Sequence, residues 1–185
     1  MTHIIFTTRR TIGRHLQVSD VDALLEVYGD ADAMRWVGDG EPLTREQCVE
    51  WVAVSERNYR TRGYGMSALV EHESGEVIGF CGLVHPAGQI DAELKYAFKR
   101  SHWGRGLATE AAAAMLTYAQ ESLGLRYAIA TTAPQNLASQ RVLNKAGMRP
   151  APDFIDPDGT VVRCFAWHAP APAKNEIHLP QQSLA

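Results

Sequence analysis

Apolar residues recur at intervals of three and four in the first third of the chain, which predicts two helices there. The first is expected to start at Ser19-Asp20, because the Ser19 hydroxyl can accept from free backbone N–H groups and acids suit the positive helix end. The second is expected to start at Thr44, where Gln47 completes a capping box. The predicted buried faces are Leu24, Leu25, Val27 and Tyr28 in the first helix, and Cys48, Trp51, Val52 and Ser55 in the second.

Beyond residue 65 the apolar period changes to two, which predicts strands separated by turns. Strands are expected at residues 66–70, 77–84, 92–98, 127–132 and 161–167, with a further strand directly before the last one. The turn Glu73–Glu76 joins the first two strands, and Gly75 suits the positive φ that such a turn needs. A second turn is expected at 156–159, before the last strand.

Two further helices alternate with the later strands. One is expected over residues 107–122, and the other is expected to be capped by Asn136 and to end at Gly147. This order of elements predicts an α/β domain, a mixed sheet with helices on both faces, over residues 1–168. Prolines among small and polar residues predict a flexible tail at 169–185.

Composition narrows the classes of function. The chain has 185 residues, 45% of them hydrophobic, which suits one domain with a core that needs no metal or disulfide. Its net charge of −3 shows no basic excess, so we expect no nucleic-acid partner. The three cysteines form no C-x-x-C pair, and no metal site is predicted. A short apolar N-terminus and the absence of a bilayer-length apolar run favour a cytoplasmic protein with no membrane partner.

The segment from Ser101 to Gly106 joins a strand end to a helix start and carries the clearest chemistry. Backbone N–H groups at a helix start lack intrahelical partners, and glycines let a phosphate come close to them. Arg105 adds a charged donor, so the segment predicts a diphosphate cradle. The Gly-Lys-Ser/Thr of a P-loop is absent. The dinucleotide fingerprint would need glycine or alanine where Thr109 stands, and a plain Gly-x-Gly turn is the remaining interpretation.

Two longer patterns decide between these interpretations. Trp103-Gly104-x-Gly106-x-Ala108-Thr109-Glu110-Ala111 is followed by Asn136-x-x-Ser139-x-x-Val142-Leu143-x-Lys145-x-Gly147-Met148. Together they strongly resemble the GCN5-related N-acetyltransferase (GNAT) family. Thr8–Arg14 looks like the opening strand of its ribosomal-protein N-terminal acetyltransferase branch, and Glu76–Leu83 looks like its third strand. The resemblance covers residues 8–168 and implies a mixed, mostly antiparallel twisted sheet, splayed between two parallel strands, with helices on both faces.

The same resemblance implies where acetyl-CoA binds. It would lie in the splay between the strand that ends at Phe98 and the strand at 127–132. Backbone groups near Ala97 and Phe98 would hold the pantetheine, and Asn136 and Ser139 would line the far side. The diphosphate would lie on the loop formed by His102, Trp103, Gly104, Arg105, Gly106, Leu107, Ala108 and Thr109.

The implied reaction is direct attack of an amine on the thioester, and it requires a base. An alkylammonium has a pKa of about 10.4 and an α-amine one of about 8, so a proton must leave before attack. Glu93, on the strand beside the cofactor, is the best candidate, directly or through water; the alternative is an exposed carboxylate in a cross-strand ion pair. Many relatives carry a tyrosine acid where Leu143 stands. Ser139 therefore remains as the local proton donor, or as a plain helix-surface hydroxyl.

Three residues are candidates for contacts with the acceptor. Arg35 and Trp36 belong to the helical region that lines the acceptor site in this fold, although tryptophans there are more often core anchors. His85 ends a strand near the substrate side, and a simple loop histidine is the alternative. Cys81, in an apolar strand, is expected to pack rather than react. Lys95 stands where relatives often have glycine.

The favoured function is an acetyl-CoA-dependent N-acetyltransferase that acts on a primary amine. Branch resemblance favours a protein N-terminal α-amine as the acceptor. The same transfer to a small molecule, such as an aminoglycoside, a polyamine or an amino acid, is a second hypothesis. A catalytically silent acyl-CoA-binding sensor is a third, because the usual tyrosine is missing. The expected partners are acetyl-CoA and the amine, bound by a monomer or a homodimer.

Overall fold

The computed structural model describes residues 3–36, 40–155 and 159–171 of the chain. The strands are β1 (Ile4–Thr7), β2 (Thr11–His15), β3 (Met66–Glu71), β4 (Val77–Val84), β5 (Glu93–Phe98), β6 (Tyr127–Thr132), β7 (Arg149–Ile155) and β8 (Val161–His168). The helices are α1 (Val21–Tyr28), α2 (Ala31–Met34), α3 (Arg45–Arg62), α4 (Leu107–Glu121) and α5 (Leu137–Lys145). Within the described residues the strands form an eight-stranded sheet in the order β1-β2-β3-β4-β5-β6-β8-β7.

The sheet consists of two antiparallel parts joined by one parallel pair of strands. Strands β1 to β5 pair antiparallel in sequence order, and β6, β8 and β7 form the second antiparallel part. The parallel pair is β5 and β6, which meet in register at Glu93 and Ile129. No other register pair joins the described residues of these two strands, so they separate toward their C-terminal ends. We call the gap beyond Glu93 and Ile129 the splay.

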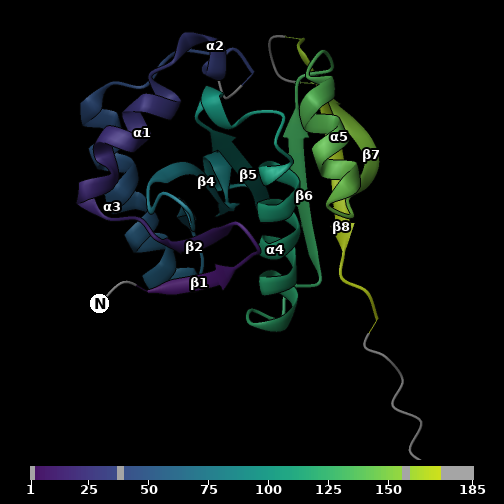
Figure 1. The fold of residues 1–185 in the computed structure, drawn as a ribbon. Coiled ribbons are helices and arrows are strands. Elements are labelled where there is room, and N and C mark those ends of the chain that lie inside the picture. The colour runs from purple at the N-terminus through teal and green to yellow at the C-terminus, as the bar shows by residue number, and fades with distance from the viewer. Residues whose placement is uncertain (1–2, 37–39, 156–158, 172–185) are drawn as a thin grey trace, which may run out of the picture.

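Alternate residues of β5 show which helices cover each face of the sheet. Leu94 and Phe98 are buried in a cluster with α4 and α5, whereas Ala97 packs against a second cluster that includes α1 and α3. Successive strand residues point to opposite faces. Tyr96 therefore faces α4, and Lys95 faces the side of α1 and α3. Figure 1 shows α4 and α5 together in front of the sheet, with α1 and α3 grouped apart from them.

Most predicted helix caps and strands are confirmed. The Thr44 N–H donates to Gln47 Oε1 over 2.7 Å, and the Gln47 N–H donates to Thr44 Oγ1 over 3.3 Å, which completes the capping box of α3. Asn136 Oδ1 accepts from the Ser139 N–H over 3.0 Å at the start of α5. Gly75 has a φ of 72° in its turn. Local sequence therefore sets these boundaries.

The predicted start of the first helix is wrong in detail. The capping position of α1 is Asp20, not Ser19, and Ser19 lies inside a short 3-10 turn before the helix. Asp20 is buried, and its two carboxylate oxygens accept from Arg14 over 2.7 and 2.8 Å. This ion pair with β2 fixes the entry of the helix, and periodicity along the helix does not reveal such a partner.

The predicted opening strand at Thr8–Arg14 is also wrong in part. Residues 8–10 form the turn of a hairpin between β1 and β2, and only residues 11–15 are β2. The Thr8 and Thr11 hydroxyls lie 2.9 Å apart across this turn. The predicted turn at 156–158 and the predicted tail at 172–185 lie outside the described residues, and the domain boundary at 168 stays a prediction. In the described part of the chain, each helix is too short or too polar to cross a membrane.

Candidate active site

The splay presents the unpaired backbone edge of β5. Strand residues direct their N–H and C=O groups alternately to either side of the strand. The Ala92 carbonyl accepts from β6 and the Lys99 N–H donates to β4, both over 2.9 Å. The backbone groups of Tyr96 and Phe98 therefore face the splay, and those of Ala97 face β4. Any pantetheine contact along this edge falls to Tyr96 and Phe98 in place of Ala97.

The predicted diphosphate loop runs from a 3-10 turn at Arg100–His102 into the first turn of α4. Gly104 and Gly106 have φ values of 73° and 76°, and a side chain at Gly104 would meet nothing within 4 Å. The backbone N–H groups of His102 and Trp103 are used inside the 3-10 turn. The donors that the loop offers therefore begin at Gly104 and continue into the helix start, where N–H groups lack intrahelical partners. This open backbone cradle fits an anion such as a diphosphate.

Side chains next to the loop are held by ion pairs. Arg105 lies 2.9 Å from Glu71 at the end of β3, and His102 Nε2 lies 3.8 Å from the same carboxylate. The Ser74 hydroxyl is the main cause of the lowered pKa of Glu71, and Arg105 and His102 lower it further. A guanidinium carries five N–H donors, so Arg105 keeps donors for a phosphate while it is paired.

Arg10 fastens the diphosphate loop to the start of α4. Its backbone N–H and Nε donate to Glu110 over 2.9 and 2.8 Å, and its Nη1 donates to the Arg105 carbonyl over 2.7 Å. Burial raises the pKa of Glu110, but hydrogen bonds from Thr8 and Arg10 lower it by more. The sequence did not predict this contact, because 100 residues separate its partners. One signal in the sequence was Glu110, an acid in the first turn of the helix whose start is predicted to bind an anion. An acid in that place would repel the anion unless a nearby cation neutralised it.

Glu93 is buried in the structure, with 3% of its side chain exposed. Its Oε1 accepts from the Thr131 N–H over 3.2 Å and from the Thr131 hydroxyl, and it forms an ion pair with Lys95. Lys95 Nζ also donates to Thr131 Oγ1 over 3.1 Å, so this side chain reaches across the splay from β5 to β6. The alternative of an exposed carboxylate in a cross-strand pair is wrong, because the cation stands two residues along the same strand and the carboxylate is enclosed.

Ser139 of α5 meets a tyrosine that comes from β5. The Tyr96 hydroxyl lies 2.8 Å from Ser139 Oγ and donates to the Ser139 carbonyl over 3.3 Å. Burial raises the pKa of Tyr96, so the phenol stays protonated at neutral pH. Leu143, at the usual tyrosine position, is buried in the core. Strand alternation indicates that Tyr96 faces α4, but only the packing of α5 brings it to Ser139.

Two predicted acceptor residues lie at the surface. Arg35 and Trp36 follow α2, and the Arg35 guanidinium stands 5.0 Å from the centre of the Trp36 ring. Trp36 is 37% exposed, so it is not the core anchor that its residue type suggested. The pair borders residues 37–39, which lie outside the described part of the chain.

His85 is held by its own loop at the end of β4. Its Nδ1 lies 2.8 Å from the Gln89 carbonyl, which can only accept, so Nδ1 carries the proton. Its Nε2 lies 2.8 Å from the Tyr64 hydroxyl. Both ring nitrogens are used within the fold, which favours the interpretation as a loop histidine.

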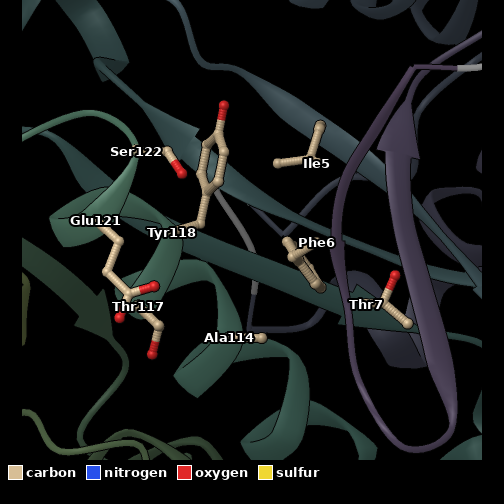
Figure 2. Close-up of a pocket in the computed structure, with 8 residues that line it drawn as sticks. All are labelled: Ile5, Phe6, Thr7, Ala114, Thr117, Tyr118, Glu121 and Ser122. Atoms are coloured by element: carbon tan, nitrogen blue, oxygen red, sulfur yellow. The ribbon is translucent and has the colours of Figure 1, made fainter.

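Two other features lie outside the predicted site. Cys81 is fully buried and burial raises the pKa of its thiol, which confirms that it packs rather than reacts. Figure 2 shows an open groove whose walls come from β1 and from the second half of α4. Its lining contains none of the predicted site residues, so the groove and the splay are separate places.

The comparison with known families agrees with this geometry. The Acetyltransferase (GNAT) domain family matches residues 10–149. The chain belongs to the GNAT family. It is an acetyl-CoA-dependent N-acetyltransferase, and its mixed, mostly antiparallel sheet with one parallel pair confirms the predicted fold.

Individual relatives of this GNAT enzyme share most of its length. The Bacillus subtilis protein YkkB is 36% identical over 126 residues, which cover 66% of this chain and 71% of YkkB. The FsC-acetyl coenzyme A-N(2)-transacetylase of Aspergillus fumigatus is 30% identical over 138 residues, 69% of this chain and 57% of that protein. The solved structure of RimL, a ribosomal L7/L12 alpha-N-protein acetyltransferase in complex with coenzyme A, superposes with a TM-score of 0.76. Its identity is 18%, over 90% of this chain and 98% of that one, so the likeness is one of fold.

Proposed function

We propose that this GNAT enzyme acetylates a protein N-terminal α-amine, which approaches Glu93 at the closed end of the splay. The observation that carries the proposal is the buried Glu93 carboxylate, whose charge is balanced by Lys95. A balanced carboxylate gives little attraction to a polycation. An α-amine, with a pKa of about 8, is partly uncharged at neutral pH, whereas alkylamines with a pKa of about 10.4 stay charged. The name of RimL, which shares the fold, supports the same class of acceptor.

The residues present fit acetyl-CoA, which supplies an activated acetyl thioester when bound. In this proposal the loop from Gly104 to Thr109 holds the diphosphate with its backbone donors, and Arg105 assists. The Phe98 carbonyl already accepts from Trp103 Nε1 over 2.8 Å, so Phe98 offers its N–H and Tyr96 both of its backbone groups. Asn136 and Ser139 line the α5 side.

Glu93 takes the proton from the acceptor ammonium. Thr131 and Lys95 hold Oε1 in place, and Oε2 carries none of the three contacts that fix Oε1. The proton therefore goes to Oε2, directly or through one water molecule. General base catalysis of this kind contributes about 100-fold or more to a rate.

Ser139 gives a proton to the departing thiolate, and the Tyr96 hydroxyl then turns its hydrogen from the Ser139 carbonyl to Ser139 Oγ, 2.8 Å away, and replaces that proton. A thiol has a pKa of about 8.5, so the thiolate needs little assistance. The structure thus offers a phenol beside Ser139 although the usual tyrosine position holds Leu143. The hypothesis of a silent sensor was based on the missing tyrosine, and the contact of Tyr96 with Ser139 argues against it.

A small-molecule amine is the second candidate. The Aspergillus fumigatus relative that is 30% identical to this chain is named FsC-acetyl coenzyme A-N(2)-transacetylase. Such an acceptor would also be deprotonated by Glu93. The two candidates differ in what surrounds the amine, a peptide backbone in one and a small scaffold in the other.

A panel of amines with release of free CoA as the readout tests the proposal. Peptides with different first residues are compared with a polyamine, an aminoglycoside and free amino acids. We expect kcat/KM for the best peptide to exceed that of each small amine by about tenfold or more. The same peptide with a blocked N-terminus is the matched control and should release no CoA above background. A small amine that is the best substrate would overturn the choice of acceptor.

A further inference from the structure

We propose that Lys95 is an internal acceptor, and that this enzyme acetylates the Lys95 side chain when no external amine is bound. The proposal rests on the proposed place of the acetyl thioester in the splay. The observation that led to it is the position of one amine, which lies between the two strands that the acetyl group must enter.

Lys95 lies on β5, two residues beyond the one paired position at Glu93. Its Nζ donates to Thr131 of β6 over 3.1 Å, so the amine spans the splay at the level where the strands begin to separate. The side chain is 37% exposed, so it is open to a ligand although its tip is anchored. An amine in this place stands beside any thioester that enters the splay.

The proposed base already contacts this amine. Lys95 Nζ forms an ion pair with Glu93 Oε1, and Glu93 is otherwise enclosed. An external ammonium must approach the same carboxylate at Oε2, so Lys95, which is paired with Oε1, stands beside the position that the acceptor needs. The amine of Lys95 and the base Glu93 therefore lie together where the thioester is proposed to enter, before any external amine binds.

The proposed transfer consumes one acetyl-CoA for each Lys95 side chain. Glu93 accepts a proton from the Lys95 ammonium, and the freed Nζ lone pair forms a bond to the carbonyl carbon of the thioester. The carbon–sulfur bond breaks, and CoA leaves as a thiol after it takes a proton from Ser139, which is reprotonated from solvent through Tyr96. The new amide nitrogen loses its second proton, and this proton and the one on Glu93 pass to solvent. The products are an Nζ-acetylated Lys95 and free CoA, with one net proton released to solvent.

The two other lysines in the described part of the chain, Lys99 and Lys145, lack this combination and provide controls. Lys99 lies just beyond the end of β5 and pairs with Glu26 of α1 at 2.6 Å, with 13% of its side chain exposed. Lys145 is exposed at the end of α5. Lys145 therefore reports the background reaction of a free surface amine with acetyl-CoA.

The test is to incubate the full chain with acetyl-CoA alone and to measure acetylation at each lysine by peptide mass spectrometry over time. We expect Lys95 to be acetylated at least about tenfold faster than Lys145, because an amine held beside the bound thioester reacts within the complex. Equal rates at the two lysines would overturn the proposal. An accepted peptide amine, added in excess, should slow the reaction at Lys95 and leave Lys145 unchanged.

Two variants sharpen the result. Glu93→Gln should slow acetylation of Lys95 about tenfold or more, because the base is removed, and should not change Lys145. Lys95→Arg keeps a cation beside Glu93 but cannot form this product, so its mass gain should fall to the background level. Binding of acetyl-CoA, followed as a thermal shift, should persist in Lys95→Arg.

The outcome separates this inference from the proposed function. If peptides are acetylated while Lys95 stays unmodified, the internal acceptor is overturned and the proposed acceptor stands. If Lys95 is modified but no peptide releases CoA, the internal acceptor is supported and the proposed acceptor is overturned. If acetyl-CoA binds and neither reaction occurs, both are overturned.

Discussion

The two ends of the splay are built from different kinds of contact. The proposed cofactor end offers backbone groups, at the positive-φ glycines Gly104 and Gly106 and at the start of α4, with Arg10 holding the loop from another part of the chain. The proposed acceptor end consists of side chains, with Glu93 and Lys95 both in contact with Thr131. Backbone donors are present whatever side chains the neighbouring residues carry, whereas a cluster of side chains changes with a single substitution.

This difference explains what each end reveals about function. A loop whose donors are backbone groups leaves a mark in the sequence as glycines at fixed spacing before a helix, and that mark indicates the cofactor. The acceptor end leaves no comparable mark, because its chemistry depends on which side chains meet across the two strands. Variants at the acceptor end should therefore change turnover, and variants at the cofactor end should change the affinity for acetyl-CoA.

The largest effect is expected from Glu93→Gln. The amide cannot take the proton of the acceptor, so kcat should fall about 100-fold or more, while the KM for acetyl-CoA should change little. Release of free CoA at saturating amine measures kcat, and a titration of acetyl-CoA measures its KM. Full turnover in this variant would show that Glu93 is not the base.

A smaller loss is expected from Tyr96→Phe and Ser139→Ala. Each should lower kcat about tenfold, because the thiolate loses its proton relay. If the two hydroxyls act in sequence, the double variant should lose no more than either single variant, since the effects of groups in one network are not additive. Measurement of kcat for the three variants tests this. If the loss of kcat in the double variant equals the product of the two single losses, the two hydroxyls act independently.

The cofactor end is tested by Gly106→Ala, with Gly124→Ala as the matched control. Both glycines have positive φ, 76° and 67°, so each substitution should cost about 1–2 kcal/mol of folding free energy. Only the alanine at Gly106 lies in the diphosphate loop, where its β-carbon would be 3.6 Å from Arg10 Nη2. We expect the KM for acetyl-CoA to rise severalfold in Gly106→Ala alone. Urea unfolding and initial rates give the two quantities, and equal KM values in both variants would contradict the loop assignment.

The smallest effect concerns the Arg10–Glu110 contact and depends on pH. The pKa of Glu110 in the folded protein is lowered from 4.5, so the contact contributes stability above that pH and loses it as pH falls through the lower, folded value. Because both side chains are partly exposed, the contribution should be about 1 kcal/mol or less. The stability difference between the native chain and Glu110→Gln should therefore shrink when thermal unfolding is measured in increasingly acidic buffer. A difference that stays constant with pH would show that the ionised carboxylate is not the cause.

Local features of the chain could be predicted well. The capping box at Thr44, the cap at Asn136 and the period of two along β5 follow from contacts within a few residues. The same period could have placed Glu93 and Lys95 on one face, because they are two residues apart. The start of α1 was misplaced, since Asp20 is buried against Arg14 of β2, and a partner in another element is not visible in helical periodicity.

The sequence by itself determined the class of fold, and it predicted the loop for the diphosphate and the candidate carboxylate, because each depends on neighbouring residues or on a spaced motif. Only the tertiary structure decided what these groups contact. It joins Tyr96 to Ser139 across 43 positions, Lys95 to Thr131 across 36 and Arg10 to Glu110 across 100. Such pairs form when strands and helices pack, and the free energy that selects them comes from burial and hydrogen bonding between distant segments. The order of residues along the chain does not show which distant residues meet, so these three contacts became visible only in the folded molecule.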